Sequence, residues 1–342
     1  MKVIVDGFGG DNAPAEVLRG SALAVKEYGV SVIITGDAEK LKVSAQENGI
    51  SLDGIEFAQA AQVITMEDEP TDVLKAKSDC SMAVGLKLLK TGEGDAFVSA
   101  GNTGALVVGS STLAGRIKGI KRAALAPMLP TTKNPYMLMD SGANLDCRPE
   151  MLVQFGIMGS VYMNRIMGIP SPRVGVVNVG TEPTKGTELE IEANRLFSHA
   201  PVNCIGNVEA RELPLGGCDV AVTDGFTGNV ILKLTEGLAK GFSGSLKDML
   251  LKNIGTKLAA LALKGGIAEF RKSMDYTEYG GAPLMGIARP VIKAHGSSDA
   301  KAFKNAIRQA KLFCEQDVIG EIEAALLELK QNLAAQDEQN KE

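Results

Sequence analysis

Four segments of this chain share one layout, in which a short run of apolar, β-prone residues ends at a polar, glycine-rich loop and a helix-like segment follows. The four loops are Asp6–Asp11, Ser99–Gly104, Asn178–Gly186 and Asp224–Asn229. In an open α/β sheet such loops lie along the edge where parallel strands end, so their N–H groups and helix N-termini converge on one ligand. The layout therefore predicts an anion pocket.

Further apolar runs are typical of strands, and helical periodicity fills the gaps between them. The strands that we expect are Val3–Val5, Val30–Ile34, Ala96–Val98, Ala123–Leu129, Tyr136–Met139, Val174–Val177, Val220–Thr223 and Val291–Ile292. Pro14 and the pair Ser298–Asp299 have the positions of helix starts. Alternating strands and helices predict a mainly parallel sheet with helices on both faces, which is the three-layer α/β/α class. The 342 residues suffice for one large α/β unit or two lobes.

Composition excludes several classes of function. The 36 basic and 41 acidic residues give a net charge of −5, which argues against nucleic acid as the main partner and leaves small anions or another protein. The five cysteines contain no C-x-x-C pair, and the two histidines have no ligand-spaced neighbours, so neither a disulfide framework nor a metal site is predicted. Neither a secretion signal nor a membrane-spanning run is visible, and we expect a cytoplasmic protein.

Residues 240–275 differ in charge from the rest of the chain. Seven basic and three acidic residues lie between Lys240 and Asp275, and apolar residues recur there at helical spacing, interrupted by glycines. This pattern predicts a basic, amphipathic helical hairpin. Either it packs on the sheet or on a second subunit, or it docks an anionic membrane or an acidic protein. The docking hypothesis rests on Lys247, Leu250, Lys252, Lys257 and Leu258.

Common nucleotide and hydrolase motifs are missing from the sequence. There is no G-x-x-x-x-G-K-[ST], and Gly7–Asn12 has Asn12 where a dinucleotide fingerprint needs its third glycine. There is also no G-x-S-x-G nucleophile motif. By contrast, Gly-rich turns with Asn and Thr donors, and Lys185 beside Gly186, are suited to phosphate.

His295 follows the strand at Val291–Lys293 and precedes the predicted helix start at Ser298–Asp299. This placement would bring its imidazole to the same edge of the sheet as the glycine loops, where it could act as acid, base or anion ligand. A loop histidine that only hydrogen-bonds the helix cap has nearly equal support.

Seven motifs, taken in order, resemble a known family over nearly the whole chain. They are Asp6–Pro14, Ser99–Ala105, Ser141–Cys147, Gly206–Glu209, Val222–Asn229, Tyr279–Gly286 and Ala294–Ser298. They are similar to those of the bacterial phosphate acyltransferases known as PlsX, which convert an acyl carrier protein thioester and inorganic phosphate into an acyl phosphate for phospholipid synthesis. Two segments depart from the family pattern: Gly7–Phe8 stands where Ala-Met is usual, and Thr181–Pro183 where a more acidic pair is common.

The resemblance implies a fold like that of phosphotransacetylases and isocitrate dehydrogenases. One lobe would comprise residues 1–100 with 288–335 and the other residues 101–287, facing across a cleft, with a flexible tail at 335–342. It also implies a homodimer without a cofactor, associated peripherally with the inner face of the membrane. Its partners would be acyl carrier protein, inorganic phosphate and a downstream glycerol-3-phosphate acyltransferase, with the hairpin binding lipid or carrier.

For the reaction we expect direct attack of a phosphate oxygen on the thioester carbonyl, which demands positioning more than activation. The expected catalytic residues are Lys185, Asn229, His295 and Asp224. The residues expected to bind phosphate or the oxyanion, or to organise those groups, are Asp11, Gly101, Asn102, Thr103, Gly104, Thr227, Gly228 and Ser297. Cys147 and Cys204 have no activating base nearby in the sequence, which disfavours a covalent route.

Two alternatives remain open. One is an NAD- and metal-dependent decarboxylating dehydrogenase of the same broad fold, for which Asp140, Asp146, Asp219 and Asp224 could form a cation site. The other is a non-catalytic sensor of phosphate or acyl chains that reports at the membrane. The glycine loops fit phosphate better than they fit the metal and carboxylate substrate of the dehydrogenase, and the transferase is favoured over both alternatives.

Overall fold

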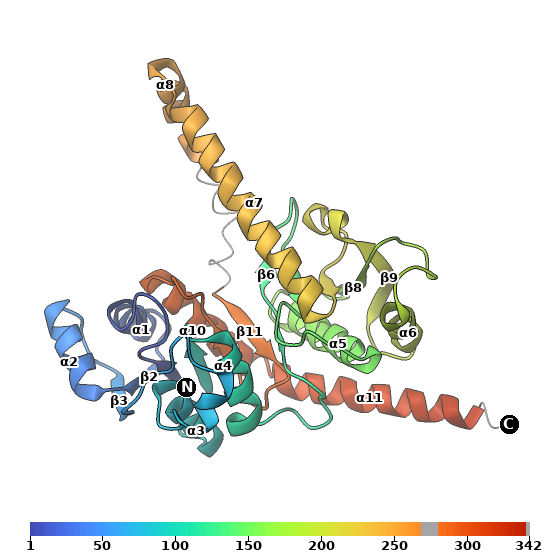
Figure 1. The fold of residues 1–342 in the computed structure, drawn as a ribbon, viewed down its shortest axis with the longest axis horizontal. Helices are drawn as coiled ribbons and strands as arrows, with labels where there is room; N and C mark the ends of the chain where they lie inside the picture. The colour runs from blue at the N-terminus through green and yellow to red at the C-terminus, as the bar shows by residue number, and fades with distance from the viewer. Residues whose placement is uncertain (268–279, 340–342) are drawn as a thin grey trace.

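Two β-sheets, each covered by helices, form the two lobes of the computed structural model, which describes residues 1–267 and 280–339 (Figure 1). The first lobe holds a seven-stranded sheet. Its strands, in spatial order, are β3 (Ile55–Gln59), β2 (Ser31–Gly36), β1 (Lys2–Asp6), β4 (Ala96–Ser99), β12 (Val291–Lys293), β11 (Ala282–Met285) and β5 (Ala124–Leu125).

The first five of these strands run parallel, and only β11 and β5 are antiparallel to their neighbours. Strand β1 shows why the central strands of this sheet are unbroken apolar runs in the sequence. Val3 and Val5 belong to one core cluster, together with Leu18, whereas Ile4 belongs to a second cluster, with Leu86. Because a strand inside a parallel sheet is buried on both faces, both sets of alternate residues must be apolar.

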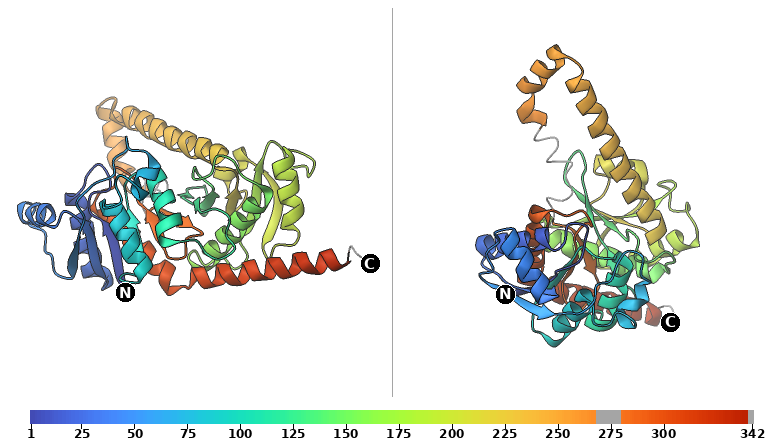
Figure 2. Two further views of the ribbon diagram at one scale, coloured as in Figure 1. Left: turned by 60° about the horizontal axis from the view of Figure 1, so that its bottom comes forward. Right: turned by 60° about the vertical axis from the view of Figure 1, so that its left-hand side comes forward.

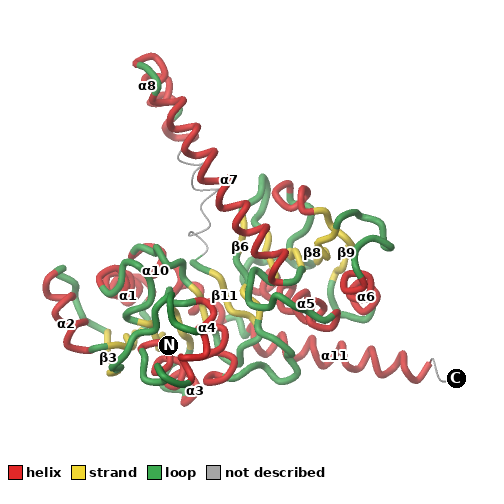
Figure 3. Tube along the Cα trace, in the orientation of Figure 1, coloured by secondary structure: helices red, strands yellow, loops and turns green. Residues whose placement is uncertain are grey.

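The helices of the first lobe lie on both faces of its sheet, as Figure 3 shows by element type. They confirm the three-layer α/β class, and α10 begins at the predicted position because Asp299 accepts a hydrogen bond from the Ala302 N–H at 2.8 Å. The helical elements are α1 (Ala15–Tyr28), α2 (Ala38–Glu47), η1 (Pro70–Leu74), α3 (Ser81–Thr91), α4 (Thr103–Gly109), η2 (Ser110–Ala114) and α10 (Ala300–Glu315).

The second lobe holds a five-stranded sheet, parallel except for its edge strand β6. Its strands, in spatial order, are β6 (Met128–Leu129), β7 (Tyr136–Met139), β10 (Val220–Val222), β8 (Arg173–Asn178) and β9 (Asn203–Glu209). The helical elements of this part of the chain are α5 (Pro149–Arg165), α6 (Glu188–Phe197), η3 (Ala210–Leu215) and α11 (Val318–Gln339), the last of which packs against α5.

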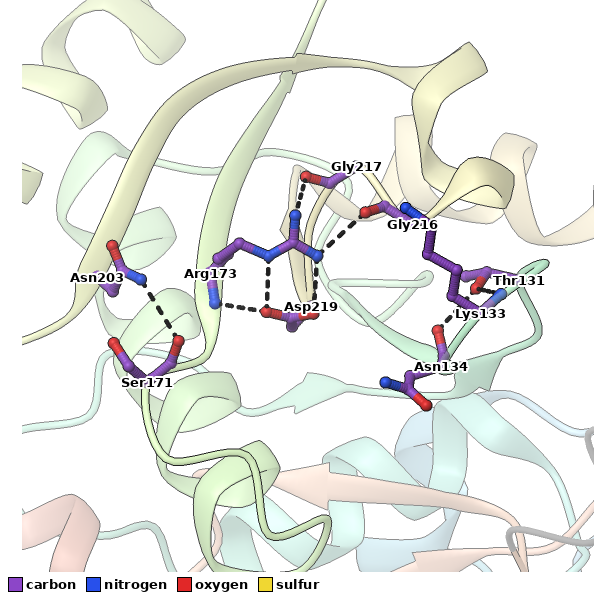
Figure 4. A network of polar contacts seen from close by, with 9 residues as sticks. All are labelled: Thr131, Lys133, Asn134, Ser171, Arg173, Asn203, Gly216, Gly217 and Asp219. Carbon is purple, nitrogen blue, oxygen red and sulfur yellow. Dashed lines mark hydrogen bonds and ion pairs between the residues drawn. The ribbon is translucent and has the colours of Figure 1, made fainter.

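Arg173, the first residue of β8, fixes the start of this sheet (Figure 4). Its guanidinium donates to both carboxylate oxygens of Asp219, at 3.1 and 3.0 Å, and to the carbonyl oxygens of Gly216 and Gly217. A bidentate pair of this kind is geometrically specific. Because Asp219 precedes β10, the pair holds the beginnings of β8 and β10 in register, at the edge opposite the glycine loops.

A long helix projects from the body of the molecule. Helix α7 (Gly225–Leu251) starts within the fourth glycine-rich segment, one residue after Asp224, and α8 (Ile254–Ala262) packs back against it at the far end (Figures 1 and 2). The predicted hairpin at 240–275 therefore begins earlier, within a helix that starts at the site, and residues 268–275 lie outside the described residues. No helix in the described part of the chain is long and apolar enough to cross a membrane.

Some strands differ from the expectations of the sequence. β3, β9 and β11 are additional strands, and the single run expected at Ala123–Leu129 divides into β5 and β6, one in each sheet. The chain passes from one lobe to the other there, at Pro127, whose missing N–H cannot join a ladder. Helix α11 continues to Gln339, so the described part of the expected tail is helical. The exact lobe boundaries and the fraying of this end stay predictions. Strands β5 and β11 fall in the range 101–287 that is expected for the second lobe, and they pair in the seven-stranded sheet of the first lobe.

Candidate functional site

Three polar residues stand side by side where β1, β4 and β12 end. Lys293 of β12 pairs in register with Ser99 of β4. Asp6 and Ser99 are also neighbours, because the residues directly before them, Val5 and Val98, pair across β1 and β4. All three are buried, with exposed fractions of 1% for Asp6, 0% for Ser99 and 9% for Lys293. Charged and hydroxyl side chains in the middle of an apolar sheet edge indicate a site rather than a packing position.

Asp6 and Ser99 hold the first two glycine loops in place. The Ser99 hydroxyl donates to the Asp6 carboxylate at 2.7 Å and accepts the Gly101 N–H at 3.0 Å. A Cβ at Gly9 would lie 2.6 Å from the Asp6 carboxylate, so this loop position accepts only glycine without rearrangement. Burial raises the pKa of Asp6, against the hydrogen bonds and the Lys293 charge, which lower it.

Lys293 supplies the buried positive charge of the first lobe. Its ammonium donates to the main-chain carbonyl oxygens of Ala100 at 3.2 Å and Ala294 at 2.6 Å. Burial lowers the Lys293 pKa to about 8, with a smaller contribution from Lys233, while Asp6 and Asp11 act in the opposite direction. The ammonium form therefore still predominates at neutral pH.

In the second lobe, Asp140 organises the loop that follows β7. This fully buried carboxylate accepts the N–H groups of Leu125, Gly142, Ala143 and Asn144, at 2.9, 3.3, 3.2 and 2.7 Å, and the Asn144 amide at 3.0 Å. Burial raises its pKa. With its lone pairs engaged in this way, Asp140 acts as a brace for the loop and not as a ligand for a cation.

A cavity of about 310 Å³ lies between the two lobes, lined by residues from both sheets and from α7. Its apolar lining residues are Leu125, Pro127, Met128, Leu129 and Leu232. Its polar lining residues are Thr103, Ser141, Asn229, Lys233, Glu236, Lys293, His295 and Ser298. The arrangement suits a ligand that has an apolar chain and a charged end.

Three of the residues predicted from the sequence meet in this cavity: Thr103, Asn229 and His295. The ring Nδ1 of His295 accepts the Ser297 N–H at 3.2 Å and lies 2.8 Å from the Ser297 hydroxyl. In the neutral imidazole, a δ nitrogen that accepts a backbone N–H leaves the proton on the ε nitrogen. Ser297 thus orients the His295 ring.

Other predicted residues shape the loops and do not line the cavity. The Asn102 side chain accepts the Ala105 N–H at 3.0 Å and donates to the Thr65 carbonyl at 3.1 Å, so it caps α4. Asp224 caps α7 by accepting the Thr227 N–H at 2.9 Å. These bonds agree with an organising role. The remaining members of this group are Gly101, Gly104 and Gly228, which pack closely against their neighbours, and Asp11, whose N–H donates to the Gly296 carbonyl.

Lys185 lies elsewhere, in the exposed loop after β8. Its carbonyl accepts the Asn178 amide at 3.0 Å, and its N–H donates to the Glu182 carbonyl, which shapes this loop locally. Lys185 is not among the residues that line the cavity. Its catalytic role stays a prediction.

Sequence reasoning missed five polar residues of the cavity: Ser141, Lys233, Glu236, Lys293 and Ser298. One signal could have identified Lys293, because a lysine that directly continues an apolar strand run is unusual in a sheet buried on both faces. Lys233 and Glu236 form an ion pair at 2.9 Å and resemble an ordinary surface pair of a helix. Only the fold shows that they face the cavity.

The cysteines do not have the properties of nucleophiles. Burial raises the pKa of the Cys147 thiol to about 12, with a further contribution from Asp140, and burial also raises the pKa of Cys204. Because the thiolate is the reactive form, these shifts disfavour both thiols as nucleophiles. Among the described residues, no group of three or more His, Cys, Asp or Glu side chains could hold a metal ion.

Residues 1–321 match the model of a family described as fatty acid synthesis protein. A protein named phosphate acyltransferase from Alkaliphilus oremlandii is 50% identical over 322 residues, which are 94% of this chain and 96% of the relative. A phosphate acyltransferase from Clostridium botulinum is 46% identical over 333 residues, 97% of this chain and 99% of the relative.

Solved structures with a similar fold include a phosphotransacetylase from Streptococcus pyogenes, with a TM-score of 0.60 and 18% identity over 93% of this chain and 94% of that one. The EutD phosphotransacetylase from Staphylococcus aureus has a TM-score of 0.57 and 16% identity, covering 91% of this chain and 94% of that one. At such identities the likeness concerns the fold alone, which agrees with the expectation from the sequence. The match to the family model and the identity to relatives over almost the full length show that this chain belongs to the family of fatty acid synthesis proteins.

Proposed function

We propose that this protein is a phosphate acyltransferase, which transfers a fatty acyl group from an acyl carrier protein thioester to inorganic phosphate. The names of the full-length relatives support the enzyme class. The products would be an acyl phosphate and free carrier thiol, as a step toward phospholipids.

The observation that carries the proposal is the composition of the cavity. Its apolar lining, which includes Leu125 and Leu129, suits the first carbons of an acyl chain, and its polar lining suits phosphate. The cavity thus supports a reaction between an acyl group and an anion.

In the proposed step, a phosphate oxygen attacks the thioester carbonyl carbon and forms a C–O bond. The carbonyl π electrons move onto the carbonyl oxygen, giving a tetrahedral intermediate. When this collapses, the C–S bond breaks, the acyl phosphate is released and the carrier sulfur leaves with the electron pair. The sulfur takes up the proton that the attacking hydrogen phosphate gives up, relayed through His295 or water, so that no other reactant is consumed.

Asn229 and Thr103 are the proposed donors to phosphate or to the developing oxyanion, because both line the cavity. His295, oriented by Ser297, is the proposed acid for the leaving thiol. Asp224 and Asp11 would act through the loops that they organise. A role for Lys185 requires its exposed loop to move toward the cavity on substrate binding.

We further propose that the helical hairpin docks a partner. Ile254 and Leu258, in the helix α8 at the far end of the hairpin, have exposed fractions of 79% and 63%, and Lys247, Lys252 and Lys257 are also exposed. Figure 2 shows how far the hairpin projects from the body. Apolar and basic groups together suit the surface of an anionic membrane or the acidic carrier protein. Peripheral membrane contact, a homodimer and a downstream glycerol-3-phosphate acyltransferase belong to this proposal.

A direct assay tests the function. The purified protein is incubated with a long-chain acyl carrier protein thioester, with or without inorganic phosphate, and hydroxylamine traps the acyl phosphate as a hydroxamate. We expect a hydroxamate that requires both phosphate and protein. No product at any phosphate concentration, from protein that is shown to be folded, would exclude this function.

A further inference from the structure

The first lobe brings two polar groups to the cavity whose hydrogen bonding is incomplete. They are the Lys293 ammonium and the Ser298 hydroxyl, in residues with exposed fractions of 9% and 5%. Both line the cavity, on the side formed by the loop that follows β12. Buried polar groups in folded proteins nearly always have partners, so two groups with hydrogen bonds to spare at one cavity suit the binding of a polar ligand there.

Ser298 is held rigidly, yet its hydroxyl is unused. Its N–H donates to the His295 carbonyl at 3.0 Å, and its own carbonyl accepts the Asn12 side-chain amide at 3.3 Å. Across the part of the chain that the structure describes, the Ser298 Oγ has no hydrogen-bond partner. A fixed backbone with a buried, unpaired hydroxyl is a preorganised donor.

Lys293 has a donor to spare. An ammonium group carries three N–H bonds, and the acceptors for it in residues 1–267 and 280–339 are the carbonyls of Ala100 and Ala294. These two carbonyls fix the direction of the group without neutralising its charge. The third N–H is therefore available to a ligand in the cavity, while Asp6 and Asp11 are the carboxylates that act on the charge.

We infer that Lys293 and Ser298 together bind the inorganic phosphate substrate, through the Lys293 ammonium and the Ser298 hydroxyl. The identity of the anion as phosphate rests on the proposed function. The pair provides the fixed positive charge that the sequence suggested for Lys185. It lies on the first lobe, whereas Asn229 comes from the second, so phosphate would be held between the lobes.

The charges around Lys293 agree with this role. The charged or titratable groups that face it are Asp6 on β1, Asp11 in the first loop, His295 in its own loop, and Lys233 with Glu236 on α7. Lys233 is paired with Glu236, and Asp6 accepts the Ser99 hydroxyl. A dianion beside Lys293 would be stabilised strongly, because charge-assisted hydrogen bonds gain strength in a partly buried site.

The binding of inorganic phosphate, without acyl substrate, tests the inference by isothermal titration calorimetry. We expect Lys293→Met and Ser298→Ala each to weaken the affinity by about 10- to 100-fold, as for lost hydrogen bonds to a charged group. Lys26→Met, which removes an exposed lysine of α1, is the matched control and should bind as the wild type does. Circular dichroism and thermal unfolding check that each variant is folded.

The pH dependence adds a signature that a merely structural lysine would not give. Because the pKa of Lys293 is about 8, its charge is lost as the pH rises above that value. The wild type should therefore lose phosphate affinity relative to Lys293→Arg between about pH 7 and pH 9, since arginine stays charged. The ionisation of phosphate also changes with pH, but it affects both proteins equally. The ratio of the two affinities at each pH therefore reports on residue 293 alone.

The outcomes separate this inference from the proposed function. Acyl transfer with an unchanged KM for phosphate in folded Lys293→Met would overturn the inference and leave the function intact. If the protein binds phosphate through Lys293 but transfers no acyl group, the inference stands and the proposed function is wrong. If Lys293→Met does not fold, the test rests on Ser298→Ala. An affinity and a KM for phosphate equal to those of the wild type in Ser298→Ala would then refute the inference that the two residues bind phosphate together.

Discussion

Gly228 of α7 lies directly against the main-chain carbonyl of Asp140, so that a Cβ at residue 228 would come within 1.8 Å of that oxygen. Asp140 braces the loop after β7, and the residue next to Gly228 is Asn229, which lines the cavity. The contact therefore sets how closely the start of α7 approaches the second sheet. It fixes the position of Asn229 through the backbone alone.

Substitution of Gly228 by alanine should damage both stability and activity. The added methyl has no room, and overpacking of this kind costs about 1 to 3 kcal/mol or more. Denaturant unfolding and turnover measure the two effects. Gly237→Ala, in the same helix but with no atom within 4 Å of its added Cβ, is the control. It should be neutral or stabilising, and equal behaviour of the two variants would contradict the packing argument.

Asn229→Ala should lower turnover by about 100-fold while the fold survives, as expected for the loss of one preorganised donor. The sequence predicts a loss of similar order for Lys185→Ala, although Lys185 lies in an exposed loop outside the cavity. Steady-state kinetics of both variants compares the two groups. Full activity in Asn229→Ala would remove this residue from the mechanism, and full activity in Lys185→Ala would do so for Lys185.

Cys147→Ala should retain turnover within about 2-fold, because a thiol with a pKa near 12 is not ionised at neutral pH. Incubation with acyl thioester in the absence of phosphate, followed by mass spectrometry of the intact protein, provides a second readout. No acyl-protein adduct should form. A mass increase by one acyl group that disappears in Cys147→Ala would show a covalent route instead.

Much of the fold could be predicted from the sequence, because it depends on local patterns. The loops after β1, β4, β8 and β10 follow fully apolar runs and were located correctly. Strand β3 was missed because its burial is incomplete and its residues, such as Glu56, do not alternate clearly. The run at Ala123–Leu129 gives no local signal for the lobe to which each half belongs.

The site could be predicted only in part, because convergence is a tertiary property. Asn229 and His295 were identified from loops whose placement follows from the topology. Lys293 appeared to be the end of a strand, and the fold explains its burial, because β4 and β11 flank β12. Lys185 stands in a glycine loop with a suitable composition, yet that loop follows β8 and stays exposed.

Lys293 should make the free energy of unfolding depend on pH. Burial lowers its pKa in the folded protein to about 8 from an ordinary value of 10.5. Below about pH 8 the buried lysine is charged, and the full cost of burying that charge lowers the free energy of unfolding. This cost falls as the pH rises from about 8 toward 10.5, the pKa of the lysine in the unfolded chain. The wild type should therefore gain stability relative to Lys293→Met in this interval, by up to about 3 kcal/mol. Denaturant unfolding at about pH 7, 9 and 10 measures it, and a constant difference would contradict the burial argument.

Reversal of charge on the hairpin should weaken docking. Replacement of Lys247, Lys252 and Lys257 by glutamate should reduce sedimentation with anionic vesicles, or affinity for acyl carrier protein, by about 10-fold or more. Lys26, Lys75 and Lys330, exposed elsewhere in the chain, supply a control with the same change in net charge. Loss with vesicles only would assign the hairpin to lipid, and loss with carrier only would assign it to the protein. If both remain unchanged, the docking proposal is wrong.

The central claim is that phosphate itself attacks the thioester, and the stoichiometry of a single reaction tests it most directly. Carrier thiol and acyl phosphate are quantified together as inorganic phosphate is increased from zero, without metal or nucleotide. The account predicts no thiol release at zero phosphate, saturable release as phosphate rises, and one acyl phosphate formed for each thiol. Thiol release that does not need phosphate, or that yields free fatty acid in place of acyl phosphate, would contradict it.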